Sequence, residues 1–247
     1  MTLAEIRTQV RKRLGETTSA FWTDAELNTY INLGLKDLSW RTKCLRANGS
    51  FGAISCESST VSAKSNEYTV SSVLSEDCYA ITEAYFKVDG EDFDRLIPTN
   101  RADLDTLSPG WQSLVGYTYT NTASGVITYN YESICSTPTH YYWDREEDIF
   151  GLYPPPNDDQ AGSNYIKCYY TYTHTNLSSD SATPTIPEPL HMAAVDFSVA
   201  SGFEDRGWGD RANDFWNKYF KKVSEYDVER KNEREDEEII MKGYRNI

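Results

Sequence analysis

The residues that could perform acid–base or metal chemistry are few and widely spaced. The three histidines, His140, His174 and His191, have no neighbour at the spacing of a zinc-binding motif such as HExxH. Consecutive cysteines lie 12 to 57 residues apart, which matches neither a disulfide framework nor a zinc site. We therefore expect reduced cysteines, no metal and no cofactor, with His174 exposed on a strand and His191 at the start of a helix.

Acidic side chains form one dense cluster with catalytic potential. Asp144, Glu146, Glu147 and Asp148 could include the two carboxylates of a glycoside hydrolase, but that chemistry depends on their separation in space. A charged turn between two strands is the simpler interpretation. The sequence also lacks a GxSxG motif, a glycine-rich phosphate loop and a recognisable Cys–His pair, so we predict that the protein is not an enzyme.

Eighteen tyrosines and six tryptophans form an excess of side chains that are stable when half-buried at interfaces. Several fall on predicted strands, where they could stack on sugars, pack against an adjacent subunit, or fill the core of a sandwich. The residues concerned are Tyr117, Tyr119, Tyr129, Tyr131, Tyr141, Tyr142, Trp143 and Tyr153.

The formal net charge of -14 argues against a protein whose overall field binds the phosphate backbone of DNA. An acidic wall would instead repel DNA and allow it to slide past. No apolar run of about 18 residues is present, and the chain begins with an amphipathic helix rather than the apolar region of a signal peptide. We expect an intracellular, soluble product.

Two short helices are predicted at the start of the chain. Thr2 and Glu5 form a capping box for the first, and Thr23 and Glu26 form one for the second, which continues to about Thr42. Arginines and a lysine give the first helix a basic outer face, which is either solvated or paired with an acidic neighbour. An αα-hairpin is the expected result.

From residue 47 to 183 the pattern changes to short segments rich in Tyr, Thr and Val between turn residues, which is typical of β-strands. Asp89-Gly90 predicts a hairpin, and residues 100–104 a short helix. Strands are predicted near residues 52–56, 67–70, 80–88, 92–96, 116–120, 126–131, 140–144, 148–153 and 164–175.

The stretch Pro187–Ile247 predicts two further helices, separated at Gly207-Trp208-Gly209, with Asp210 as N-cap of the last. That helix has an aromatic face that must be buried: Ala212, Phe215, Trp216, Tyr219, Val223 and Tyr226. Residues 227–238 hold seven acidic and three basic side chains, so a helix from Asp210 through Glu238 would be about 43 Å long and project beyond its core. The apolar residues that follow, from Ile239 to Ile247, belong either to a frayed terminus or to a peptide that becomes ordered on a partner.

We therefore predict an α+β protein. Its helical bundle combines two N-terminal and two C-terminal helices, from residues 1–46 and 184–226, because neither pair is long enough to fold alone. A large antiparallel β domain, residues 47–183, is inserted between them. Residues 227–247 form an extended C-terminal tail.

Several motifs in this order resemble a known family. They are "TLAEIRTQVRKRLGE", "FWTDAELNTYINLGLKDL", the strand motif within "YYWDREEDIFGLYPPP", and the closing helices "IPEPLHMAAVDFSVASGFEDRGWGDRANDFWNKYFKKV". Together they are similar to the head-to-tail adaptor, or connector, proteins of tailed bacteriophages. The large β insertion departs from the simpler, almost wholly helical members.

The resemblance implies a structural protein that forms a ring, commonly of twelve copies, at the head–tail junction of the virion after assembly in the host cytoplasm. Its partners would be the portal protein and a tail nozzle, tail-tube or fibre protein, and DNA would pass through the lumen without specific binding. The residues expected to dock on the portal are Tyr226, Ile239, Ile240, Met241, Tyr244 and Ile247. Those expected at inter-subunit contacts are Arg7, Arg11, Arg13 and Trp208. The alternative is a carbohydrate-binding or fibre-docking β module on a helical stem.

Overall fold

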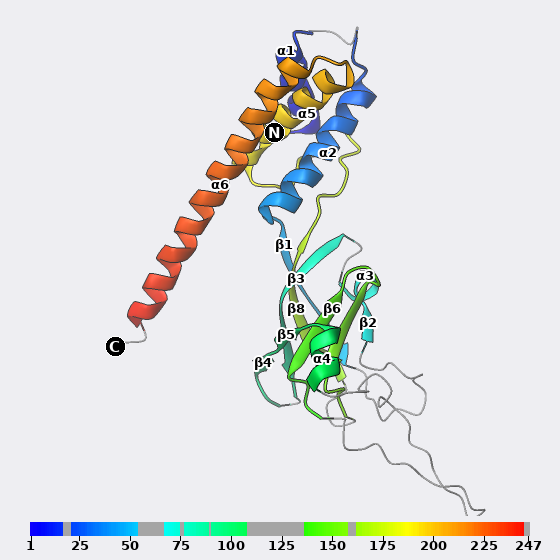
Figure 1. Ribbon diagram of the computed structural model, residues 1–247, viewed down its shortest axis with the longest axis vertical. Coiled ribbons are helices and arrows are strands. Elements are labelled where there is room, and N and C mark those ends of the chain that lie inside the picture. Colours follow the sequence, from blue (N-terminus) through cyan, green and yellow to red (C-terminus); the bar gives the residue numbers. More distant parts are fainter. Residues whose placement is uncertain are drawn as a thin grey trace, which may run out of the picture. The chain divides into compact units, whose positions relative to one another are not determined.

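The computed structural model describes residues 1–16, 21–53, 67–74, 77–88, 90–107, 136–157 and 162–244. Among these residues the protein is α+β, with six α-helices and two four-stranded sheets. The chain divides into two compact units (Figure 1). One combines Met1–Leu45 with Thr173–Ile247, and the other is Arg46–Tyr172. The predicted domain division, with an inserted β-rich domain over residues 47–183, stays a prediction.

The helical unit contains α1 (Leu3–Leu14), α2 (Asp24–Thr42), α5 (His191–Asp205) and α6 (Gly209–Tyr244), with a 3-10 turn at Glu188–Leu190 before α5. Both predicted capping boxes are confirmed. Thr2 and Glu5 exchange side-chain to backbone hydrogen bonds at the start of α1, and Thr23 and Glu26 do the same for α2. These boxes satisfy backbone N–H groups that otherwise lack partners within a helix.

Helix α5 is the centre of this unit and contacts α1, α2 and α6. It is therefore buried nearly all round rather than along one face, and it starts at His191 as expected. Small residues allow the close approach, since a Cβ at Gly34 of α2 would lie 2.9 Å from the ring of Phe197. Asp196 is fully buried and accepts hydrogen bonds from Arg13 of α1 and Lys222 of α6. A buried carboxylate is stable only with such partners.

Helix α6 buries the predicted aromatic face, with Ala212, Tyr219 and Val223 in the core. One expectation is wrong: Asp210 lies in the first turn instead of at the N-cap, because Gly209 already begins the helix. As the sequence indicates, the helix continues beyond Tyr226 through Glu238, and it ends only at Tyr244, so its 36 residues span about 54 Å. Figure 1 shows α6 continuing past the end of α2.

The β unit has two sheets. The first has the order β1 (Arg46–Ala53), β8 (Gly162–Tyr172), β3 (Cys78–Lys87) and β4 (Phe93–Arg95). The second has the order β2 (Glu67–Thr69), β7 (Ile149–Tyr153), β6 (His140–Asp144) and β5 (Ile97–Thr99). Strands β3 and β4 pair across the predicted hairpin. Because β5 and β6 are parallel, the prediction of a wholly antiparallel domain is wrong. A long connection containing α4 (Arg101–Leu107) separates these two strands, as parallel pairing requires.

The two sheets bury their facing sides against each other. Phe86 and Ile166 of the first sheet share a core with Phe150 and Leu152 of the second. Helix α4 covers the other side of the second sheet, where Leu104 packs on Tyr142. A four-residue helix, α3 (Val70–Val73), follows β2 and was absent from the sequence prediction. The strands predicted at 116–120 and 126–131 lie outside the described residues.

A candidate protein-docking surface

Exposed aromatic rings and arginines gather at the turn between α5 and α6. We call this surface the Trp208 patch, formed by Phe21, Trp22, Phe203, Arg206, Trp208 and Arg211. Gly207 ends α5 in the left-handed region, with φ of 73°, which a side chain rarely adopts. The backbone N–H of Trp208 then donates to the carbonyl of Phe203, which fixes the tight turn.

The rings of the Trp208 patch are arranged in layers. Phe21 and Trp208 stack with ring planes 8° apart and centroids separated by 6.1 Å. Trp22 lies edge-on to Trp208 at 6.0 Å and is buried beneath it. Phe21 is 51% exposed and Trp208 is 42% exposed, so the outer layer is half in solvent. Such aromatic pairs are stabilised beyond the area that they bury.

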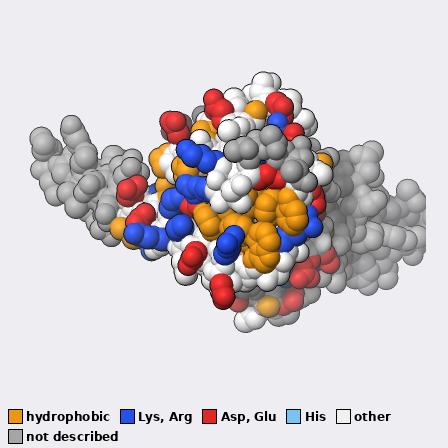
Figure 2. All heavy atoms as spheres, turned by 90° about the horizontal axis from the view of Figure 1, so that it is seen from above, with side chains coloured by type: hydrophobic (Ala, Val, Ile, Leu, Met, Phe, Trp, Pro, Cys, Tyr) orange, Lys and Arg blue, Asp and Glu red, His pale blue; other side chains and the backbone are white. Residues whose placement is uncertain are grey.

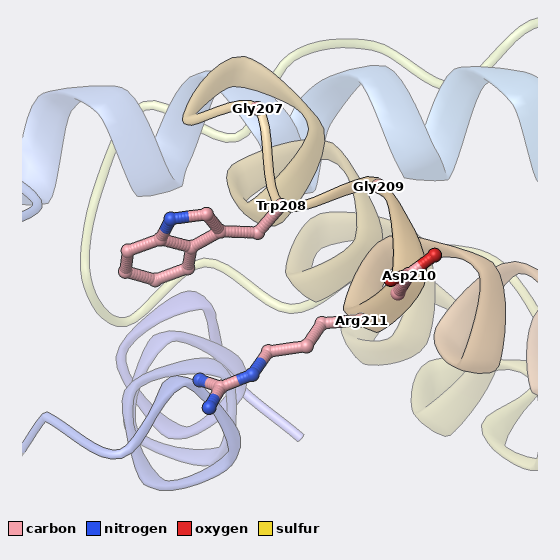
Figure 3. A pocket seen from close by; sticks show the side chains of 5 residues that line it. All are labelled: Gly207, Trp208, Gly209, Asp210 and Arg211. Atoms are coloured by element: carbon pink, nitrogen blue, oxygen red, sulfur yellow. The ribbon is translucent and has the colours of Figure 1, made fainter.

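Arginines flank the rings. The guanidinium of Arg206 lies 4.6 Å from the centroid of Phe21, and that of Arg211 lies 5.7 Å from Trp208. Figure 3 shows Trp208 and Arg211 projecting from the same side of the turn, with Asp210 directed away from them. These residues, with Gly207 and Gly209, line a pocket of about 470 Å³.

Arg211 makes no ion pair with any carboxylate among the described residues, whereas Arg206 has a long contact of 3.4 Å to Glu26. Seen toward the end of the unit where α6 begins, hydrophobic side chains form one group bordered by Lys and Arg (Figure 2). Tryptophan and arginine are the residue types most enriched at the energetic centres of protein interfaces. The Trp208 patch can therefore offer a ring surface together with donors for a carboxylate.

The three arginines of α1 that the sequence analysis expects at inter-subunit contacts do not belong to the Trp208 patch. Arg7 makes two hydrogen bonds of 3.0 Å to Asp180, and Arg13 pairs with buried Asp196. Arg11 pairs with Glu16 at 2.8 Å and donates to the carbonyl of Trp22 at 3.0 Å, beneath the patch. These contacts engage all three guanidinium groups within the chain, and an inter-subunit role for them stays a prediction.

The residues expected to dock on the portal all belong to α6 or follow it. Tyr226 is half-buried on the helix. Ile239, Ile240, Met241 and Tyr244 lie on its last turns, where the structure describes the backbone alone, and Ile247 lies outside the described residues. Arg230 donates to the carbonyl of Thr42 at the end of α2, and α6 continues about 21 Å beyond that contact.

The acidic cluster has a structural explanation. Arg101 of α4 pairs with Glu147 at 2.7 Å and with Asp144 and Glu67 at 3.3 Å each. The hydroxyl of Tyr142 donates to Glu67 at 2.6 Å, and burial raises the pKa of this tyrosine. Asp148 accepts from the backbone N–H of Ser71. The carboxylates therefore hold α4 and the β6–β7 turn in place, as the charged-turn interpretation expects.

Other chemical candidates are also engaged in packing. Tyr141 and Tyr142 are buried on opposite sides of the second sheet, so neither belongs to an exposed sugar-binding face, and Trp143 and Tyr153 are half-buried. Tyr117, Tyr119, Tyr129 and Tyr131 lie outside the described residues.

The expectation for His174 is wrong. The chain leaves the sheet at Tyr172, and His174 is buried against α2, with its backbone N–H donating to Ser39 and its Nε2 accepting from Thr185.

In the part of the chain that the structure describes, no three His, Cys, Asp or Glu side chains are grouped to hold a metal ion. Within that same part, none of the helices has both the length and the apolar character needed to span a membrane.

The described residues thus define an α+β protein whose most distinctive surface is aromatic and arginine-rich, a composition typical of proteins that bind other proteins. Residues 1–238 match the model of the SU10 adaptor protein family, and the chain belongs to this family. The match confirms the resemblance to phage head-to-tail adaptors that the sequence motifs indicate. No curated protein matches the chain.

Proposed function

We propose that this chain is a structural, non-enzymatic subunit of a ring that joins the portal of a tailed bacteriophage to its tail. The observation that supports this most directly is the geometry of α6. The helix is fixed in the core near its start, where Tyr219 is fully buried, and continues about 21 Å beyond its contact with α2. A projecting helix of this kind suits capture by a neighbouring protein ring.

In this proposal the end of α6 docks on the portal through Tyr226, Ile239, Ile240, Met241, Tyr244 and Ile247. The Trp208 patch, at the other end of the same helix, contacts the neighbouring copy. Its exposed rings and the guanidinium of Arg211 support this assignment. The family resemblance supports a closed ring of about twelve copies. Closure would require heterologous contacts between two different surfaces of each copy.

The net charge of -14 supports a passage through which DNA moves without adhering, since like charges repel across a lumen. The ring would become a component of the virion at the head–tail junction after assembly in the host. A tail component would be the second partner of the ring, and the β unit is the candidate surface for it.

The test is to measure the mass of the purified chain alone and after mixing with its portal ring. We expect the full chain to join the portal in a fixed multiple, and a chain lacking Ile239–Ile247 to keep its fold but lose portal binding. Circular dichroism controls for the fold of the truncated chain. A truncated chain that binds the portal as tightly as the full chain contradicts the docking assignment, and a full chain that never binds contradicts the proposed function.

A further inference from the structure

The outer side of the first sheet carries an unusual group of cations and rings. Strand register places Tyr85 opposite both Arg95 and Lys167, and Lys87 opposite Phe93, so these side chains share one side of the sheet. Their neighbours Phe86 and Ile166 point to the other side, into the core. We call this outer side the lysine–aromatic face, formed by Tyr85, Lys87, Phe93, Arg95, Lys167 and Tyr169.

Contacts within the lysine–aromatic face hold its cations over its rings. Lys167 Nζ lies 5.0 Å from the centroid of Tyr169 and 6.0 Å from that of Phe93, and Lys87 Nζ lies 5.9 Å from Phe93. Phe93 is 39% exposed and Tyr169 is 36% exposed. Among the described strand residues on this side of the sheet, the one carboxylate is Glu83, which accepts from Tyr85 at 2.7 Å and pairs with Arg95 at 3.4 Å. The face therefore keeps a local excess of positive charge.

That excess contrasts with the rest of the β unit. Arg46–Tyr172 contains 18 Asp and Glu against 7 Lys and Arg, a formal net charge of -11 out of the -14 of the whole chain. Three of those seven cations, Lys87, Arg95 and Lys167, are on the lysine–aromatic face. A partner with an acidic surface would be attracted to this face and repelled by the remainder of the unit.

The opposite side of the same two-sheet sandwich is acidic. Helix α4 covers the outer side of the second sheet through Leu104, and its Asp103 and Asp105 are exposed. The β6–β7 turn beside it exposes Glu146 and Glu147, and the exposed Arg145 of the same turn lies 4.7 Å from the ring centroid of Tyr79. We call this the acidic face, formed by Asp103, Asp105, Glu146 and Glu147. Arg101 lies among these carboxylates but is already paired with Glu147, Asp144 and Glu67.

We infer that the lysine–aromatic face of one copy docks on the acidic face of the β unit of the next copy. The two faces lie on opposite sides of one sandwich and differ in the sign of their charge. A contact between them is therefore heterologous, which is the kind of contact that can close into a ring. The inference rests on the proposed function and adds to it a charge-directed contact between β units.

The experiment uses the full chain and two pairs of charge reversals. Lys87→Glu with Lys167→Glu should weaken self-association about tenfold or more, and Asp105→Lys with Glu146→Lys should do the same. The chain carrying all four substitutions should assemble again, because every interface then pairs opposite charges. Lys218→Glu with Lys221→Glu, two exposed cations of α6, is the matched control and should leave assembly unchanged. Sedimentation velocity measures the assembly state.

The outcomes separate this inference from the proposed function. If the wild-type chain binds the portal and assembles, and both charge-reversal variants assemble equally well, only the β-unit contact is overturned. Failure of the fourfold variant to assemble, with its circular dichroism unchanged, also overturns it. If the α6 control weakens self-association as much as the lysine reversal does, the effect comes from the net charge of the chain, which contradicts the specific contact. Loss of binding to dextran sulfate in the lysine variant, with assembly intact, would assign the face to an anionic polysaccharide instead.

Discussion

The hydroxyl of Tyr219 on α6 donates a hydrogen bond to the carboxylate of Asp37 on α2, 182 residues away in the chain. Tyr219 is fully buried, and burial raises its pKa, so the hydroxyl remains a donor. Asp37 also accepts from Arg41 at 2.7 Å. This partly buried polar contact therefore fixes the position at which the long helix crosses α2.

Replacing Tyr219 with Phe should lower the free energy of unfolding by about 1.5–3 kcal/mol, the range for a hydrogen bond to a charged group. Urea denaturation of the full chain measures it. Tyr30→Phe is the matched control, because Tyr30 donates to Asp205 at the surface, and we expect it to cost less than about 1 kcal/mol. Equal effects of the two substitutions would contradict a special role for the buried pair.

The buried carboxylate of Asp196 should be the most sensitive charged position of the helical unit. Asp196→Asn leaves Arg13 and Lys222 facing a neutral group. We expect a loss of about 3 kcal/mol, the lower end of the range for a broken buried pair, because both cations keep partial contact with water. Asp214→Asn, at an exposed position of α6, should have no measurable effect. An Asp196→Asn variant that unfolds at the same temperature as the wild-type chain would contradict this prediction.

Trp208 should contribute more to assembly than to folding. Trp208→Ala removes a ring that is 42% exposed and stacks on Phe21, so the free energy of unfolding should fall only modestly, whereas association between copies should weaken by about 2 kcal/mol or roughly 30-fold. Trp40→Ala is the control, since Trp40 is 45% exposed on the same unit but lies outside the Trp208 patch. If both variants assemble equally well, the patch is not an inter-subunit contact.

His191 should make stability depend on pH. Burial lowers its pKa, while Nε2 lies 3.1 Å from the Ile186 carbonyl, and the Met1 amino group and Glu188 are the charged groups acting on the ring. The unfolded chain binds a proton near pH 6.5 and the folded chain only at lower pH, so stability is full above about pH 6.5 and falls as the pH decreases through the folded value.

Urea midpoints measured from pH 7.5 to 5 should therefore decline less in His191→Gln than in the natural sequence. Both proteins should lose stability in parallel below about pH 4.5, where carboxylates titrate. Superimposable curves for the two proteins over the upper range would show that His191 does not cause the dependence.

Gly151 of β7 should tolerate no side chain. A Cβ there would lie 2.0 Å from the ring of Tyr142, which is itself buried beneath α4. Gly151→Ala should cost about 1–3 kcal/mol by overpacking. Gly209→Ala is the control because nothing lies within 4 Å of its added Cβ, and it should be neutral or slightly stabilising. A double-mutant cycle with Tyr142→Ala should show that the two costs are not additive.

Local signals were sufficient for much of the fold. The capping boxes at Thr2 and Thr23, the start of α5 at His191, and the hairpin after β3 all depend on residues close together in the chain, where backbone geometry and periodicity act directly. The buried face of α6 was predictable for the same reason. The parallel pairing of β5 with β6 was not, because it depends on where a long connection returns the chain.

The candidate surfaces were likewise predictable only where they depend on residues close together in the chain. The sequence by itself determined that Trp208 stands between two glycines at a helix break, that Arg7, Arg11 and Arg13 share one helix, and that acidic residues cluster between two strands. Only the tertiary structure decided that the arginines pair within the chain, that Phe21 stacks on Trp208, and that Lys87 and Lys167 meet on one face. Hydrogen bonds and ion pairs act over a few ångströms in space, and sequence separation carries little information about which charges meet at that range.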